Sequence, residues 1–257
     1  LEVSFTYTTD DERTEKMNAM TDALCEEFSA LIDAIKADCP FDLYWADYNM
    51  FVDSSIGWSG YGKKLSVSEA SINVYVNHIF QKDSQFSISA AAANAAKNAS
   101  AKAKSIVAAA AGKSDYEKLV YYADQIMALT AYNDEAAADQ NFINSNSNPW
   151  QLIYVFDGDP DTNVVCEGYA KAFMYLCDLT TFNSDMVCCI TVTGLMSGGT
   201  GEGPHMWEVV RMEDGWNYLV DVTNCDTDTW GYPDQLFMAY STVGTASVSY
   251  RISTTEG

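Results

Sequence analysis

The side chains best suited to chemistry in this chain lie in its second half, beginning with Cys166. The residues Ala170, Phe173, Leu176 and Cys177 recur at helical spacing, which predicts a helix that begins near Cys166. At a helix N-terminus, the unpaired N–H groups and the positive end of the helix dipole favour a thiolate, the form in which cysteine attacks as a nucleophile. Cys166 is therefore our candidate nucleophile.

The chain has only two histidines, which narrows the search for a base that could serve Cys166. His78 falls on the apolar side of an alternating run, and this predicts a packed histidine within a strand. His205 stands just before a second alternating run, at residues 208–212. We therefore expect His205 to be the base, with a ring nitrogen within about 4 Å of the Cys166 sulfur.

A carboxylate that could orient His205 lies on the second arm of a predicted hairpin, whose turn ends at Gly215. A two-residue turn would pair Asp221 with Glu208 and leave His205 on the opposite face of the sheet. A three-residue loop, with a positive φ at Gly215, would pair Asp221 with Trp207 and bring His205 to the same face as Asp221. The sequence leaves both registers open, and only the second allows Asp221 to orient His205.

These residues form three blocks in order: Cys166-Glu-Gly-Tyr-Ala, then His205-Met-Trp207, then Asp221-Val-Thr223. A cysteine block at a helix start, a His-x-Trp block on a strand and an Asp-x-Thr block on the next strand resemble the transglutaminase-like superfamily of cysteine enzymes. The resemblance covers about residues 114–240. A looser match, through Asp38-Cys-Pro40 and Leu43-Tyr-Trp45, resembles the N-terminal extension of secreted or surface-attached bacterial members.

The resemblance implies an α+β fold with a papain-like core, in which the nucleophile begins a helix packed on an antiparallel sheet. It implies Cys166 as the nucleophile, His205 as general base and acid, and Asp221 as the group that orients the imidazole. The thiolate would attack an acyl carbon, and water or a second amine would resolve the thioester. An extracellular or cell-surface location is also implied, and the chemistry needs no cofactor.

We expect a peptide or protein substrate, with hydrolysis of peptide or isopeptide amides. Hydrolysis is preferred because nothing in the sequence marks an amine-acceptor site. The alternatives are protein cross-linking and a catalytically silent binding module of the same fold. Glu208 stands where many members of the superfamily carry Asn, which bears on the binding of an acceptor or on packing of the hairpin.

Two further residues are weaker candidates for the site. Gln151 could donate a hydrogen bond to an oxyanion together with the Cys166 backbone N–H, or it could be an ordinary loop glutamine. Trp207 could form a wall of the substrate cleft or belong to the core of the hairpin.

Periodicity also predicts the elements that position these residues. Residues 10–38 have the spacing of an amphipathic helix, and alternation between 41 and 81 predicts strands. A second helix is expected from about 87 to 111, ending at Gly112, with Ser114 as the N-cap of the next. We expect a domain division near residue 112, with a helix-strand-helix extension over 1–112 and the catalytic core over 113–257.

Charge and composition exclude several classes of partner. Lys and Arg total 14 against 36 Asp and Glu, which gives a formal net charge of −22. Such a chain is repelled by nucleic acids and by anionic membrane surfaces. No run of residues approaches the roughly 20 apolar residues that span a bilayer, so we expect no membrane insertion.

The seven cysteines include no CxxC pair, and their odd number predicts free thiols instead of disulfides or a structural zinc site. Cys177, Cys188 and Cys189 are expected in the core. The run 157–163 resembles the start of a calcium loop. Because the sixth position is not Gly and the twelfth is not a carboxylate, we expect an acidic turn and no metal.

Overall fold

The computed structural model describes residues 4–46, 52–139, 150–198, 201–226, 236–239, 244–245 and 248–252. Contacts group the chain into two compact units. The first unit consists of Leu1–Ile35 and Trp45–Ala90, and the second of Lys36–Tyr44 and Ala91–Gly257.

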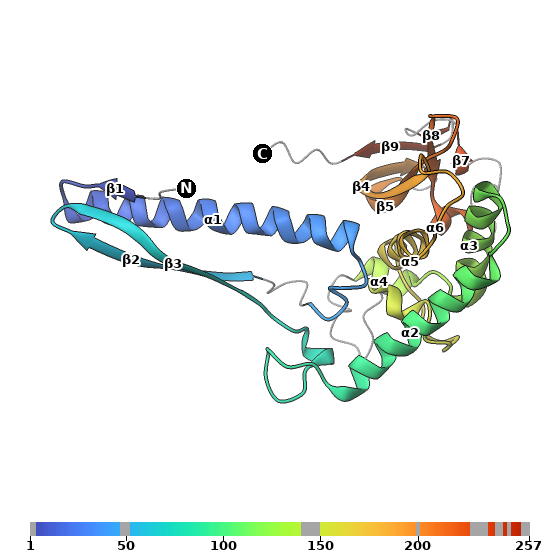
Figure 1. The fold of residues 1–257 in the computed structure, drawn as a ribbon, viewed down its shortest axis with the longest axis horizontal. Helices are drawn as coiled ribbons and strands as arrows, with labels where there is room; N and C mark the ends of the chain where they lie inside the picture. Colours follow the sequence, from blue (N-terminus) through green and yellow to red (C-terminus); the bar gives the residue numbers. More distant parts are fainter. Residues whose placement is uncertain are drawn as a thin grey trace. The chain divides into compact units, whose positions relative to one another are not determined.

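The first unit combines a long helix with a three-stranded antiparallel sheet of order β1-β3-β2. Gly62, with a φ of 62°, lies in the tight turn between β2 and β3. The helix expected over 10–38 is confirmed, although Leu31 of its apolar stripe is 51% exposed. The elements are β1 (Ser4–Thr6), α1 (Asp10–Asp38), β2 (Val52–Tyr61), β3 (Lys64–Val74) and the short 3-10 helix η1 (His78–Phe80) (Figure 1).

The prediction that His78 is a packed strand residue is wrong. β3 ends four residues earlier, and His78 begins η1 and is exposed. The Asn77 side chain caps this turn by accepting a hydrogen bond from the Ile79 N–H. The alternation of apolar and polar residues continues past the end of β3 and into this turn. The sequence pattern therefore could not show where the strand ends.

The second unit is built from helices and a six-stranded antiparallel sheet of order β7-β6-β5-β4-β9-β8, which confirms the α+β class. β9, the last described strand, lies between β4 and its neighbour in sequence, β8 (Figure 1). The elements are α2 (Ala90–Ala109), α3 (Asp115–Leu129), α4 (Asp134–Ala138), η3 (Leu152–Tyr154), α5 (Cys166–Asp178), β4 (Cys188–Gly198), β5 (Gly201–Arg211), β6 (Asn217–Val220), α6 (Val222–Cys225), β7 (Phe237–Ala239), β8 (Gly244–Thr245) and β9 (Val248–Ile252).

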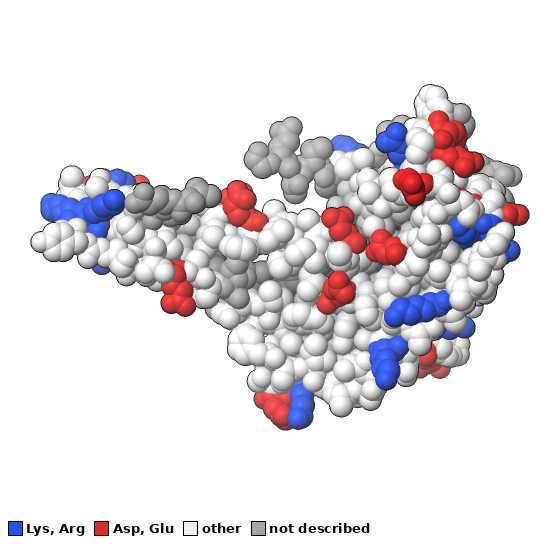
Figure 2. All heavy atoms as spheres, in the orientation of Figure 1, with Lys and Arg blue, Asp and Glu red and all other residues white. Residues whose placement is uncertain are grey.

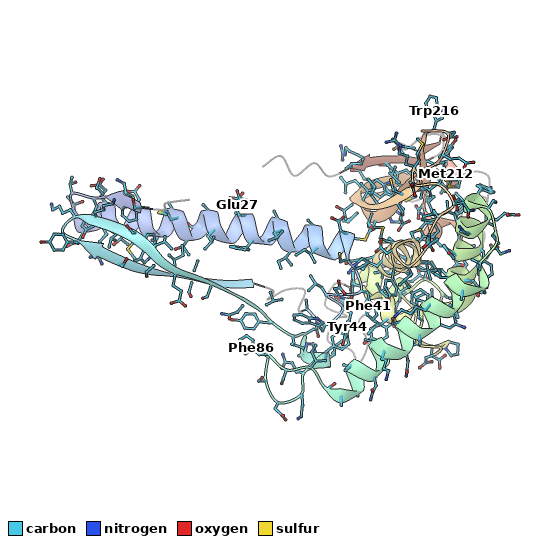
Figure 3. The ribbon with its side chains drawn as sticks, viewed as in Figure 1. Glu27, Phe41, Tyr44, Phe86, Met212 and Trp216 are labelled. Atoms are coloured by element: carbon cyan, nitrogen blue, oxygen red, sulfur yellow. The ribbon has the colours of Figure 1, made fainter. Side chains whose placement is uncertain are left out.

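Contacts place α2 in the second unit, so the grouping in the structure differs from the division expected near residue 112. The Ser100 hydroxyl in α2 lies 2.9 Å from the hydroxyl of Tyr175 in α5. The Tyr175 ring stacks on Phe41. The Phe41 ring also contacts Tyr44, and Figure 3 labels these two residues close together. Basic side chains gather over α2, which carries three lysines and no acidic residue (Figure 2).

The predicted boundary signals between α2 and α3 are confirmed. Gly112 follows α2 with a φ of 83°, a conformation that favours glycine after a helix. Ser114 caps α3 by accepting a hydrogen bond from the Glu117 N–H, and the Glu117 carboxylate accepts one from the Ser114 N–H in return.

α5 is buried on all sides and not only on the apolar face that the sequence predicts. Glu167 and Lys171 are buried within it as an ion pair of 2.6 Å. Burial of these charges is tolerable because they lie one turn apart on the same side of the helix and neutralise each other. α5 contacts both β4 and β5, so the residue at its start is placed against the centre of the sheet.

The β5–β6 hairpin has the three-residue loop, which decides between the two registers. Arg211 pairs with Asn217, and Glu208 pairs with Val220. The loop closes on Gly215, whose φ is 82°. The register with Glu208 opposite Asp221 is excluded, because Glu208 pairs with Val220, the residue before Asp221. Figure 3 shows the exposed Trp216 projecting from this turn.

The acidic segment at 157–161 forms turns, as expected. The Asp157 and Asp159 carboxylates each accept a hydrogen bond from the backbone N–H two residues further on, at 2.8 and 3.0 Å. Gly158 between them has a φ of 81°. These hydrogen bonds within the turns explain why aspartates alternate along this segment.

Candidate active site

Cys166 is the first residue of α5, where the sequence analysis places it. The N-cap residue, Val165, has no side-chain oxygen that could cap the helix. Cys166 is partly exposed, whereas the helix after it is buried. The thiol therefore combines access to solvent with a position at the positive end of the helix dipole.

His205 lies in β5, opposite Gly194 of β4, with its side chain 9% exposed. Its ring is nearly parallel to that of Trp207, with an angle of 14° and ring centroids 6.1 Å apart. The two rings lie on the same face because they are two residues apart in one strand. Trp207 is fully buried and so forms a fixed support for the imidazole.

Asp221 follows directly after β6 and is fully buried. Its Oδ2 lies 2.8 Å from Nε2 of His205, and its Oδ1 accepts a hydrogen bond from the Asn224 N–H at 3.1 Å. The second bond makes Asp221 the N-cap of α6. The expectation of an Asp-x-Thr block on a strand is therefore wrong for Thr223, because capping by Asp221 turns the chain into a helix.

The structure joins His205 and Asp221 by a hydrogen bond, and Cys166 is near enough to affect the pKa of His205. Burial alone would lower the pKa of His205, but the Asp221 carboxylate and the Cys166 side chain outweigh burial and raise this pKa well above its usual value. Burial acts in the opposite sense on Asp221, yet His205 and the hydrogen-bond donors hold the pKa of Asp221 below its usual value. An anionic Asp221 beside a protonated His205 is the state that these shifts favour. The expected separation of about 4 Å between sulfur and ring nitrogen stays a prediction.

Two residues at this site were not predicted from the sequence. The Asn224 Nδ2 donates to Oδ2 of Asp221 at 2.7 Å, and the Tyr250 hydroxyl donates to the same oxygen at 2.6 Å. Asn224 could have been found, because residues just after an N-cap often hydrogen bond to it. No pattern along the chain indicates that Tyr250, in β9, reaches Asp221.

Of the two weaker candidates, Trp207 belongs to the core of the hairpin. It is fully buried, its ring centroid is 5.0 Å from that of Tyr250, and the residues that line the cleft described below do not include it. Gln151 is buried directly before η3, and its Oε1 has no hydrogen-bond partner within the described ranges. Its role as an oxyanion donor stays a prediction.

Glu208 is fully buried beside this site, on the face of β5 opposite to His205. Among the residues that the structure describes, neither oxygen of its carboxyl group has a hydrogen-bond partner, and the Thr191 hydroxyl across from it in β4 has none either. Burial, followed by the nearby Cys189 and Asp221, raises the pKa of Glu208 well above its usual value. Glu208 is therefore held as a neutral acid.

A cleft of about 590 Å³ opens at His205. Two of its walls come from the start of β5 and from α6, and a third comes from the segment that begins α4. Cys166 is not among the described residues that line this cleft, although its side chain is partly exposed. The lining residues are Tyr132, Asp134, Met196, Gly201, Glu202, Gly203, Pro204, His205, Thr223, Asn224 and Asp226.

The six described cysteines are free thiols, and Cys25 lies outside the residues whose side chains are described. Cys177 and Cys189 are buried, as expected. Cys188 is exposed, so its placement in the core is wrong. Because side chains alternate along a strand, β4 turns Cys189 inward and Cys188 outward.

Within the described ranges, no three side chains of His, Cys, Asp or Glu are grouped so that they could hold a metal ion. None of the described helices is long and apolar enough to cross a membrane.

Comparison with known proteins does not establish a family for the chain. No family model matches it, and no curated protein matches it by sequence. Among solved structures, it is similar to a chain described as "Crystal structure of a TGase", with a TM-score of 0.41 and 15% sequence identity. The similarity covers 67% of this chain and 44% of that one, so the chain spans less than half the length of the protein that it matches.

Proposed function

We propose that the chain is a thiol-dependent acyl-transfer enzyme of the transglutaminase-like type, with Cys166, His205 and Asp221 as its catalytic residues. The observation that carries the proposal is the bond between His205 Nε2 and Asp221, with Cys166 close enough to the imidazole to affect its pKa. Nε2 is occupied by this bond, which leaves Nδ1 to exchange a proton with the thiol.

In the proposed reaction, Cys166 and His205 form a thiolate–imidazolium pair, and the thiolate attacks the carbonyl carbon of an amide. A C–S bond forms, the C–N bond breaks, and the imidazolium gives its proton to the departing amine. Water or a second amine then attacks the thioester while His205 accepts its proton, and the C–S bond breaks to regenerate the thiol. Asp221 stabilises the imidazolium and fixes the ring orientation throughout.

The proposed substrate is a peptide or isopeptide amide, and we favour water as the acceptor on the sequence argument given above. Trapping of acyl-enzymes from a peptide library, by acid quench and mass spectrometry of the Cys166 peptide, would identify the donor. Repeating the reaction with added methylamine shows whether water or an amine is the acceptor, because hydrolysis yields the free acid and transamidation yields the methylamide.

The first prediction concerns the reactivity of the thiols. We expect iodoacetamide to alkylate Cys166 at least 10-fold faster than the exposed Cys188 at pH 6, because the protonated His205 stabilises the thiolate form of Cys166. Peptide mapping by mass spectrometry over a time course measures both rates in one sample. His205→Ala should remove the advantage of Cys166 and leave the Cys188 rate unchanged. Equal rates in the wild type would indicate a silent module and count against the proposal.

A further inference from the structure

Tyr250 contacts the proposed catalytic residues from a strand that the family resemblance, which ends near residue 240, does not include. It is 5% exposed, and its hydroxyl donates to Oδ2 of Asp221 at 2.6 Å. Its ring centroid lies 6.1 Å from that of His205 and 5.0 Å from that of Trp207. Tyr250 therefore packs against the imidazole of His205 and also donates a hydrogen bond to Asp221, the partner of that imidazole.

The Asp221 carboxylate is held by more than its bond to His205. Oδ2 accepts from Tyr250 and from Asn224 Nδ2, and Oδ1 accepts from the Asn224 N–H. Together with His205, three groups contact Oδ2 and one donates to Oδ1. The Asn224 bonds come from the adjacent turn and place the carboxylate relative to α6. The Tyr250 bond ties the carboxylate to β9, in addition to the His205 bond that ties it to β5.

The sheet places β9 where Tyr250 can reach Asp221, and glycine at position 194 makes this possible. β9 pairs with β4, so that Tyr250 lies opposite Met196 and Ile252 opposite Gly194. A Cβ atom at Gly194 would lie 2.1 Å from the Arg251 carbonyl oxygen and 2.7 Å from the Trp207 ring. No side chain fits there, because β9 and Trp207 already fill the space.

We propose that Tyr250 is a positioning residue, whose hydroxyl holds Asp221 in the orientation that aligns His205 with Cys166. β9 is thereby part of the active site. This inference rests on the proposed function. It assigns to Tyr250 no contact with substrate, and its effect passes through Asp221 and His205.

The titratable groups around Asp221 determine which measurement tests this role. His205 from β5 and Tyr250 from β9 contact Asp221 directly, and the charge of Asp221 also acts on Glu208 on the other face of β5, on Cys225 in α6 and on Tyr132 before α4. The Tyr250 hydrogen bond is one of the contributions that lower the pKa of Asp221. Its loss raises that pKa, so the acid limb of a pH–rate profile should move to higher pH.

The test compares wild type with Tyr250→Phe, which keeps the ring on Trp207 and removes only the hydroxyl. The measured reaction is Cys166-dependent turnover of p-nitrophenyl acetate between pH 4 and 9. We expect kcat to fall by roughly 10- to 100-fold, the effect of losing one hydrogen bond to a charged group, with the acid limb moved to higher pH. Tyr218→Phe is the matched control, since its hydroxyl donates to Asp214 at the far end of the hairpin, and it should change neither quantity.

Tyr250→3-fluorotyrosine is the second variant, because it preserves the fold and the hydrogen bond if Tyr250→Phe does not fold. Its more acidic hydroxyl is a stronger donor, so the acid limb should move to lower pH. An unchanged acid limb in every folded variant overturns the proposal, even if Tyr250→Phe lowers the melting temperature. Absence of Cys166-dependent turnover in the wild type would overturn the proposed function, and this inference with it, whereas an active wild type with unmoved limbs overturns only this inference.

Discussion

Cys166→Ala and His205→Ala are each expected to abolish turnover of p-nitrophenyl acetate above the uncatalysed rate. Cys166→Ala removes the atom that forms the proposed thioester, and His205→Ala removes the group proposed to carry the proton in the reaction. Stopped-flow or plate-reader release of p-nitrophenolate measures the loss. Cys188→Ala, which removes an exposed thiol from β4, is the matched control and should retain full activity.

Asp221→Asn should lower kcat by about 10³- to 10⁴-fold and leave the fold intact. The rate falls because an amide cannot stabilise the imidazolium and can favour the wrong tautomer of His205. The fold should survive because Asn is as good an N-cap as Asp, and α6 begins with this cap. Circular dichroism and a thermal melt check the fold. Activity that persists in Cys166→Ala, or Asp221→Asn with wild-type kcat, would contradict the catalytic assignment.

Glu208→Gln should stabilise the protein increasingly as the pH rises. Burial raises the pKa of Glu208 in the folded state above its unfolded value of 4.5, so between these two values the folded state binds a proton that the unfolded state has lost. Folding stability therefore decreases in this window by about 1.4 kcal/mol per pH unit, and it levels off above the folded pKa. Gln has nearly the same shape and does not ionise, so the variant lacks this decrease.

Urea unfolding of both proteins at intervals between pH 5 and 9 measures this effect. The difference in unfolding free energy between the two proteins isolates Glu208, because every other titrating group is shared. Glu202→Gln, at an exposed carboxylate in the cleft wall, is the matched control and should show little pH-dependent difference. Parallel curves for wild type and Glu208→Gln would show that Glu208 is not held neutral in the fold.

The local parts of the site could be predicted from sequence because they depend on short-range rules. A cysteine before a helical pattern lies at a helix start, and a glycine that ends a turn can adopt a positive φ. Gly215 shows how far such rules reach. The sequence defined the two possible registers of the hairpin, both compatible with a positive φ at Gly215, and the pairing of Arg211 with Asn217 distinguishes them in the structure.

The remaining parts depend on contacts between distant segments. Tyr250 reaches Asp221 because β9 inserts beside β4, and the order of strands in a sheet is not encoded in the alternation of any one strand. The burial of Glu167 and Lys171 was missed for a related reason. A charged pair one turn apart usually marks a solvated helix face, and only the surrounding elements show that this face of α5 is covered.

The burial of α5 on all sides also affects how the proposed nucleophile can move. Fluctuations that displace a helix with so many buried neighbours require much of the second unit to open, and such openings have free energies close to that of global unfolding. The cleft walls at Gly201 and Gly203 lack side chains and are at least partly exposed, so they can rearrange at much lower free energy. For the proposed function, we therefore expect local motion of the walls to accommodate substrates of different shapes while the Cys166 sulfur keeps its place.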